Sequence, residues 1–124
     1  FTEAQKKDAR AVALFIQANP FAAGGPTPDA SRGEGYTAFI NLLREETVKF
    51  GKPVLLCHAD THYFRVDKPL LDPATRRTIE NFTRLETFGS SNIHLVRVTV
   101  DPDAPTIFSF REHLVPENLR TAQP

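Results

Sequence analysis

The sequence predicts an α/β fold with a mixed sheet, because two fully apolar runs flank an amphipathic helix and further strands follow. The apolar runs are Ala11–Ile16 and Pro53–Cys57, and their length and β-branched and aromatic content are typical of buried strands. Between them, the apolar residues of Tyr36–Phe50 recur at near-helical spacing. A strand, a helix and a second buried strand predict a βαβ unit with parallel strands.

Two segments complete the first half. Glu3–Arg10 is predicted to be a short polar helix, because Thr2 and Gln5 have the spacing of a capping box. Gln17–Gly33 is rich in proline and glycine, which predicts a long loop. We expect the long helix to end at Gly51.

The second half is expected to be rich in strands. A polar loop from His58 to Lys68 comes first, and a frayed tail from Glu112 to Pro124 comes last. The predicted strands between them are Phe82–Phe88, Ile93–Asp101 and Thr106–Phe110, the last two antiparallel. The prediction is thus a βαβ unit followed by β-hairpin strands in a mixed sheet, in a single domain over residues 1–124.

The composition limits the possible functions. Fifteen basic and fifteen acidic residues give no net charge, which argues against an electrostatic nucleic-acid or membrane binder. No apolar run is long enough to span a bilayer, and the single cysteine, Cys57, excludes an internal disulfide. The chain begins at Phe1 and contains no methionine, so we expect a fragment. Its compartment stays undetermined, because an export signal would lie upstream.

The strongest candidate site follows the second buried strand, where open α/β sheets bind ligands. His58, Asp60 and His62 project to the same side if the backbone stays extended. Two imidazoles and a carboxylate would suit Zn²⁺, Mn²⁺ or Fe. In the structural alternative His58 satisfies a backbone carbonyl, Asp60 caps a turn and His62 is exposed.

Two further residues are candidates for ligand binding. Asn19 follows the first buried strand, and parallel pairing would bring it near the 58–62 loop, although an Asn-Pro turn role is also open. Arg65 could clamp a phosphate bidentately, or it could be a loop charge paired with Asp67. His94 is expected to pack on the sheet, and His113 is expected to be solvated.

The order of these features resembles the C-terminal half of the calcineurin-like metallophosphoesterases, most closely a poorly characterised bacterial branch. The segments that carry the resemblance are Gln17–Pro20, Ala59–His62, Asn81–Gly89 and the Ile93–Phe110 hairpin. The first two fall where that family has a His near a Pro and a Gly-His-x-His motif. The resemblance implies an α/β sandwich in which two cations, of Mn, Zn, Fe or Mg, polarise a phosphoryl oxygen and generate a hydroxide nucleophile.

The chain also departs from the family pattern. Asn19 (or Gln17) and Asp60 stand where histidine ligands are expected, Ala59 replaces a glycine, and only His62 matches unchanged. The metal motifs of the family's first half are absent. The resemblance therefore implies an intact parent that hydrolyses phosphomonoesters or phosphodiesters, with His62, Asp60 and His58 as its late ligands, and an inactive fragment.

Two other functions stay open. The chain could be a degenerate family member that binds a ligand or partner without catalysis, or a plain structural domain. A truncated sandwich would also expose a sheet edge, so self-association is an expectation.

Overall fold

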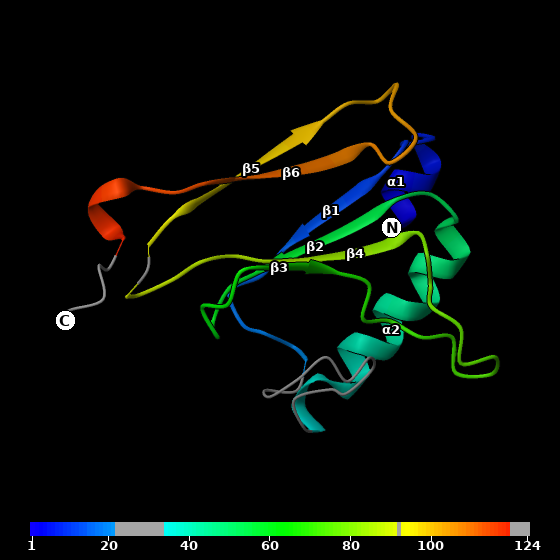
Figure 1. The fold of residues 1–124 in the computed structure, drawn as a ribbon. Coiled ribbons are helices and arrows are strands. Elements are labelled where there is room, and N and C mark those ends of the chain that lie inside the picture. Colours follow the sequence, from blue (N-terminus) through cyan, green and yellow to red (C-terminus); the bar gives the residue numbers. More distant parts are fainter. Residues whose placement is uncertain (22–33, 92, 120–124) are drawn as a thin grey trace.

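The computed structural model describes residues 1–21, 34–91 and 93–119 as a four-stranded mixed sheet between a helix and a β-hairpin (Figure 1). The sheet has the order β1-β2-β4-β3. Its strands are β1 (Val12–Phe15), β2 (Val54–His58), β3 (Arg65–Asp67) and β4 (Phe82–Glu86). The other elements are α1 (Thr2–Lys6), α2 (Glu34–Phe50), β5 (Leu95–Val100), β6 (Phe108–His113) and the 3₁₀ turn η1 (Pro116–Asn118).

The predicted βαβ unit is confirmed. β1 and β2 are parallel, with Val12 opposite Val54 and Phe15 opposite Cys57. β4 continues the parallel set on the other side of β2, whereas β3 closes the sheet antiparallel to β4. The carboxyl ends of β1, β2 and β4 therefore lie along one edge of the sheet, which we call the rim.

Two apolar layers hold the fold together. α2 packs against one face of the sheet, through a cluster that includes Ile40, Leu43, Leu56 and Phe82. The β5–β6 hairpin covers part of the other face. The residues of this second layer are Leu55, Cys57, Leu85, Phe64, Val96, Val98, Phe108 and Phe110.

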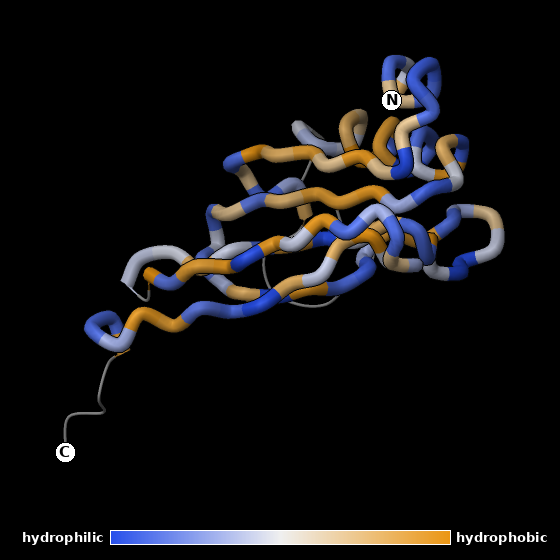
Figure 2. Tube along the Cα trace, turned by 90° about the horizontal axis from the view of Figure 1, so that it is seen from above, coloured by the Kyte–Doolittle hydropathy of each residue, from blue (hydrophilic) through white to orange (hydrophobic). Residues whose placement is uncertain are grey.

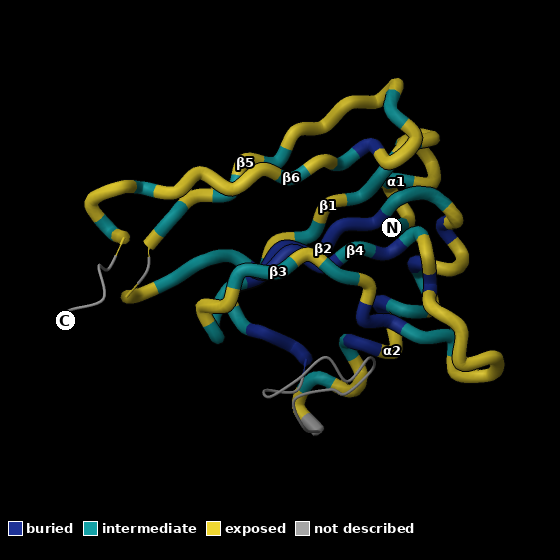
Figure 3. Tube along the Cα trace, viewed as in Figure 1, coloured by how far each residue is buried: buried dark blue, intermediate teal, exposed yellow. Residues whose placement is uncertain are grey.

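Burial is uneven between these layers. β2 is buried along its whole length and β4 nearly so, whereas most of the hairpin is exposed (Figure 3). Hydrophobic residues are concentrated in the strands and hydrophilic ones at the turns that join them (Figure 2). None of the helices in the described part is long and apolar enough to cross a membrane.

Several predicted boundaries were wrong. α1 ends at Lys6 rather than Arg10, and its N-cap is Phe1, with no side-chain cap from the expected capping box. The chain leaves the helix at Lys7 and Asp8, where Asp8 has a left-handed φ of 49° and binds Lys52. β6 extends to His113, so the tail begins later than predicted.

Two topological details also differ from the prediction. The expected loop from His58 to Lys68 contains β3, whose charges are paired with charges on β4. The hairpin strands form their own two-stranded sheet and do not join the mixed sheet, because their apolar side chains pack onto its face. The long predicted loop falls largely on residues 22–33, outside the described residues.

Candidate functional site

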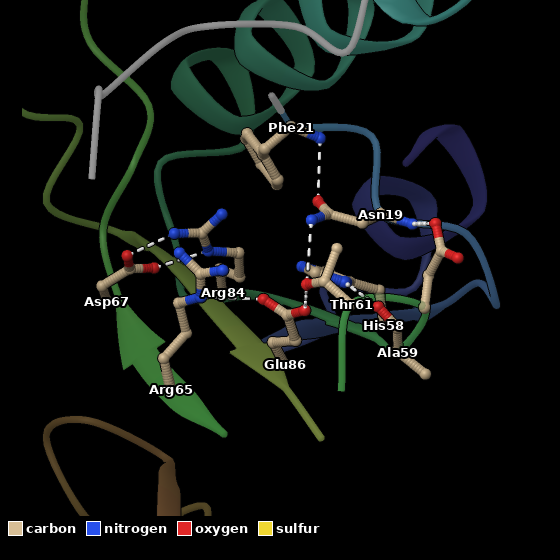
Figure 4. Close-up of polar contacts among 10 residues, drawn as sticks. Asn19, Phe21, His58, Ala59, Thr61, Arg65, Asp67, Arg84 and Glu86 are labelled. Carbon is tan, nitrogen blue, oxygen red and sulfur yellow. Dashed lines mark hydrogen bonds and ion pairs between the residues drawn. The ribbon is translucent and has the colours of Figure 1, made fainter. Parts of the chain in front are cut away.

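A group of polar and charged side chains is buried at the rim, and we call it the rim cluster. Asn19 comes from the segment after β1, His58 from the end of β2, and Arg84 and Glu86 from β4. All four are almost completely buried. The members of the rim cluster are Asn19, His58, Asp60, Thr61, Arg65, Arg84 and Glu86 (Figure 4).

Glu86 is the centre of this cluster. Its carboxylate has no solvent exposure, and Oε2 accepts a hydrogen bond from Arg65 Nε at 2.7 Å. Oε1 accepts a hydrogen bond from the Thr61 hydroxyl. A buried carboxylate is stable only when it is paired and hydrogen-bonded, so these contacts fix the loop that carries Thr61 to β4.

The predicted proximity of Asn19 to the 58–62 loop is confirmed. The Asn19 backbone N–H donates to Asp60 Oδ2 at 3.3 Å, and Nδ2 donates to Thr61 Oγ1 at 3.4 Å. Oδ1 accepts a bond from the Phe21 backbone N–H at 2.9 Å, which is the geometry of an Asx turn. The side chain of Asn19 is therefore fully engaged in holding its own turn against the loop.

The expectation that the backbone stays extended from His58 to His62 was wrong. β2 ends at His58, and Asp60 and His62 have φ angles of 80° and 60°, in the left-handed region. The Thr61 N–H turns back to the Ala59 carbonyl at 3.1 Å. Because the chain coils here, the side chains at 58, 60 and 62 do not follow the alternation of a strand.

The three predicted metal ligands consequently lie in different surroundings. His58 is buried beside the Phe21 ring, with 6.0 Å between ring centroids. Asp60 binds the Asn19 backbone, and His62 is exposed with its Nδ1 2.8 Å from the Ser90 carbonyl oxygen. In the described part of the chain, no three His, Cys, Asp or Glu side chains are grouped so that they could hold a metal ion. These residues therefore do not by themselves fit a complete metal centre.

The pKa of His58 is lowered from its ordinary value of 6.5, mainly because burial disfavours the charged ring. The Arg84 and Arg65 guanidiniums lower this pKa further, whereas the Ala59 carbonyl and the Glu86 carboxylate oppose the shift. His58 Nδ1 lies 3.0 Å from the Ala59 carbonyl oxygen, which can only accept a hydrogen bond. Nδ1 therefore carries the proton, and Nε2 is a buried acceptor that has no hydrogen-bond partner among the described residues.

Arg65 pairs with Glu86, and not with Asp67 as one alternative expected. Its Cζ lies 5.0 Å from the centroid of the Tyr63 ring. Asp67 instead binds Arg84 through both guanidinium positions Nε and Nη2, and the Arg84 Cζ lies 4.6 Å from the Phe21 ring centroid. The two ion pairs are cross-strand neighbours, with Arg65 opposite Glu86 and Asp67 opposite Arg84.

Sequence reasoning missed the roles of Glu86, Arg84 and Thr61. A signal was present, because β3 carries Arg-x-Asp while β4 carries Arg-x-Glu. In an antiparallel pair, these patterns place opposite charges across from each other twice.

The expectations for His94 and His113 agree with the structure: His94 packs edge-on against Phe88, with centroids 5.0 Å apart, and His113 is exposed.

Comparison with known proteins identifies no relative. No protein-family description, curated protein or solved structure matches the chain.

Proposed function

We propose that this chain forms part of the active site of a metallophosphoesterase-like hydrolase that cleaves phosphomonoesters or phosphodiesters. The observation that carries the proposal is the meeting of Asn19, Asp60 and Thr61 at the carboxyl ends of two parallel strands. Ligand sites of open α/β sheets lie in that position. The order of motifs along the chain, which resembles the second half of such enzymes, is the other support.

In this proposal the described residues supply only some of the ligands. His62 would be one donor to a divalent metal, which when bound supplies Lewis-acid chemistry at a phosphoryl oxygen, whereas Asp60 is engaged by the Asn19 backbone N–H and would have to give up that contact to become a second donor. Because no complete ligand set exists in the described part, we propose that the remaining donors come from residues outside it, in a longer parent protein. The chain alone is therefore expected to be inactive.

Arg65 is the proposed phosphate-binding residue. Its Nε is bound by Glu86, which fixes the plane of the guanidinium. Its terminal nitrogens have no acceptor among the described residues, and the side chain is 20% exposed. An oriented guanidinium with free N–H donors matches two oxygens of a phosphate.

The test is hydrolysis of a chromogenic phosphodiester by the full-length parent protein in the presence of Mn²⁺ or Zn²⁺, together with its metal content. We expect His62→Ala to lower both hydrolysis and metal content, and His113→Ala, on the exposed hairpin, to change neither. Equal metal content and equal hydrolysis in wild type and His62→Ala would refute the proposal.

A second candidate is a non-catalytic partner-binding domain. It is favoured by Phe15, which is 75% exposed on β1, the strand at one end of the sheet order. An exposed aromatic on an open strand edge is suited to pairing with another chain. Under this alternative the full-length protein would bind no metal and hydrolyse no phosphoester in the assay above.

A further inference from the structure

His62 is held by a second segment of the chain, the residues that follow β4. Its Nδ1 lies 2.8 Å from the carbonyl oxygen of Ser90. Because a carbonyl can only accept a hydrogen bond, Nδ1 carries the proton and Nε2 of the neutral ring has a free lone pair. A backbone carbonyl on the far nitrogen is the usual way in which a protein selects the tautomer of a liganding histidine.

Gly89 leaves the space that the His62 ring occupies. A Cβ placed on Gly89 would lie 2.2 Å from Cδ2 of His62 and 2.8 Å from its Nε2. Both separations are far below van der Waals contact, so any other residue at position 89 would displace the ring. The requirement for glycine here is steric.

Aromatic packing keeps the two segments together independently of that hydrogen bond. Phe64, two residues after His62, stacks on Phe88 with ring centroids 4.7 Å apart and an interplanar angle of 12°. Phe88 also contacts the edge of His94. Stacked rings stabilise a contact beyond the area that they bury, so this packing holds Gly89 and Ser90 at a fixed place beside His62.

We propose that Gly89 and Ser90 are positioning residues that hold His62 in one orientation and one tautomer, with Nε2 as the nitrogen that binds a ligand. The inference rests on the proposed function only for the identity of that ligand, a divalent metal. The orientation and the tautomer are properties of this chain alone.

The experiment is long-range ¹H–¹⁵N correlation spectroscopy of the ¹⁵N-labelled chain, at a pH where the His62 ring is neutral. We expect wild-type His62 to show a single tautomer with a protonated Nδ1. In Gly89→Ala the displaced ring should lose this tautomer preference. The matched control is Gly35→Ala, because a Cβ on Gly35 meets no atom of the described residues within 4 Å, and it should leave the His62 signals unchanged.

A protonated Nε2 in the wild type, or the same single tautomer in Gly89→Ala, would overturn the inference. If Gly89→Ala does not fold, the wild-type spectrum alone decides. In the full-length parent, Gly89→Ala should lower phosphodiester hydrolysis by about tenfold or more, as is typical for residues that orient a metal ligand. The expected tautomer together with unchanged hydrolysis in His62→Ala would refute the proposed function and leave the positioning of His62 intact.

Discussion

Glu86 is the residue on which the rim cluster depends most. It has no solvent exposure, and it binds Arg65 on β3 and Thr61 in the loop. Replacement by alanine removes the carboxylate and leaves the partly buried Arg65 guanidinium without its partner. Breaking a buried ion pair in this way costs about 3 kcal/mol, the lower part of the usual range, since Arg65 retains some solvent contact.

We therefore expect Glu86→Ala to lower the free energy of unfolding by about 3 kcal/mol, as measured by urea denaturation. Glu80→Ala is the matched control. Glu80 is 78% exposed and lies 3.8 Å from Lys68, and loss of such a surface pair costs about 0.5 kcal/mol. Equal losses in the two variants would show that Glu86 does not organise the cluster.

His58 makes stability depend on pH. Burial lowers the pKa of His58 in the folded state, so below the ordinary value of 6.5 the unfolded chain binds a proton that the folded chain excludes. Protonation thus favours unfolding, and the contribution of His58 to stability is lost as pH falls through and below 6.5. Three charged groups face this ring: the Glu86 carboxylate raises the pKa of His58, and the Arg84 and Arg65 guanidiniums lower it.

The prediction is a free energy of unfolding that decreases between about pH 7 and pH 5 in the wild type. His58→Gln should reduce this slope, whereas replacement of the exposed His113 by Gln should leave it unchanged. The measurement is urea denaturation at a series of pH values. A wild-type slope that survives in His58→Gln would assign the dependence to other groups.

At the scale of elements, the pattern of hydrophobic residues predicted those helices and strands whose positions are determined by apolar packing. The continuous apolar runs around β1 and β2 predicted parallel buried strands, and the periodicity of α2 predicted its position and its end at Gly51. β3 was missed because a three-residue strand of Arg65, Val66 and Asp67 has no apolar pattern. The position of β3 is set by ion pairs with Arg84 and Glu86 on β4. These partners are distant in the sequence, so local sequence patterns do not indicate the pairing.

The same limit applies to the site. The convergence of Asn19 with the 58–62 loop followed from parallel pairing, and it was predicted. The left-handed φ angles of Asp60 and His62 were not, because neither residue is a glycine. Contacts to Asn19, Glu86 and Ser90 hold this loop in its coiled form, so its geometry is a product of tertiary structure.

Two glycines, one at each end of α2, allow a test of how the helix ends. Gly51 has a φ of 68°, and its N–H closes the helix by donating to the Thr47 carbonyl at 3.1 Å. Gly51→Ala should lower the free energy of unfolding by about 1 kcal/mol, because an L-residue is strained in that region. Gly35→Ala, at the second residue of α2, should raise it by up to about 1 kcal/mol, because a Cβ there meets no atom of the described residues within 4 Å. Thermal denaturation would report opposite shifts, and a shift of the same sign in both would contradict this account of the helix end.

At the scale of the whole molecule, the two edges of the sheet differ in their protection. β3 is short and carries Arg65 and Asp67, and inward-paired charge on a short edge discourages pairing with another sheet. β1 has no charged residue, and Phe15 projects from it with 75% of its surface exposed. No strand of the described part pairs with the outward side of β1, so its backbone groups and the Phe15 ring together offer a surface on which a second strand could pair.

We expect this edge to mediate concentration-dependent self-association, in which two copies pair through β1 about a two-fold axis. Phe15→Ser should shift sedimentation velocity profiles towards the monomer and change the free energy of unfolding by less than about 0.5 kcal/mol, since the ring is exposed. Val100→Ser is the control, because Val100 is 59% exposed but lies at the end of the hairpin strand β5. If apolar exposure of any kind drove association, the two variants would behave alike. A wild type that stays monomeric at high concentration would show that an open, uncharged edge of only four residues is too short to pair.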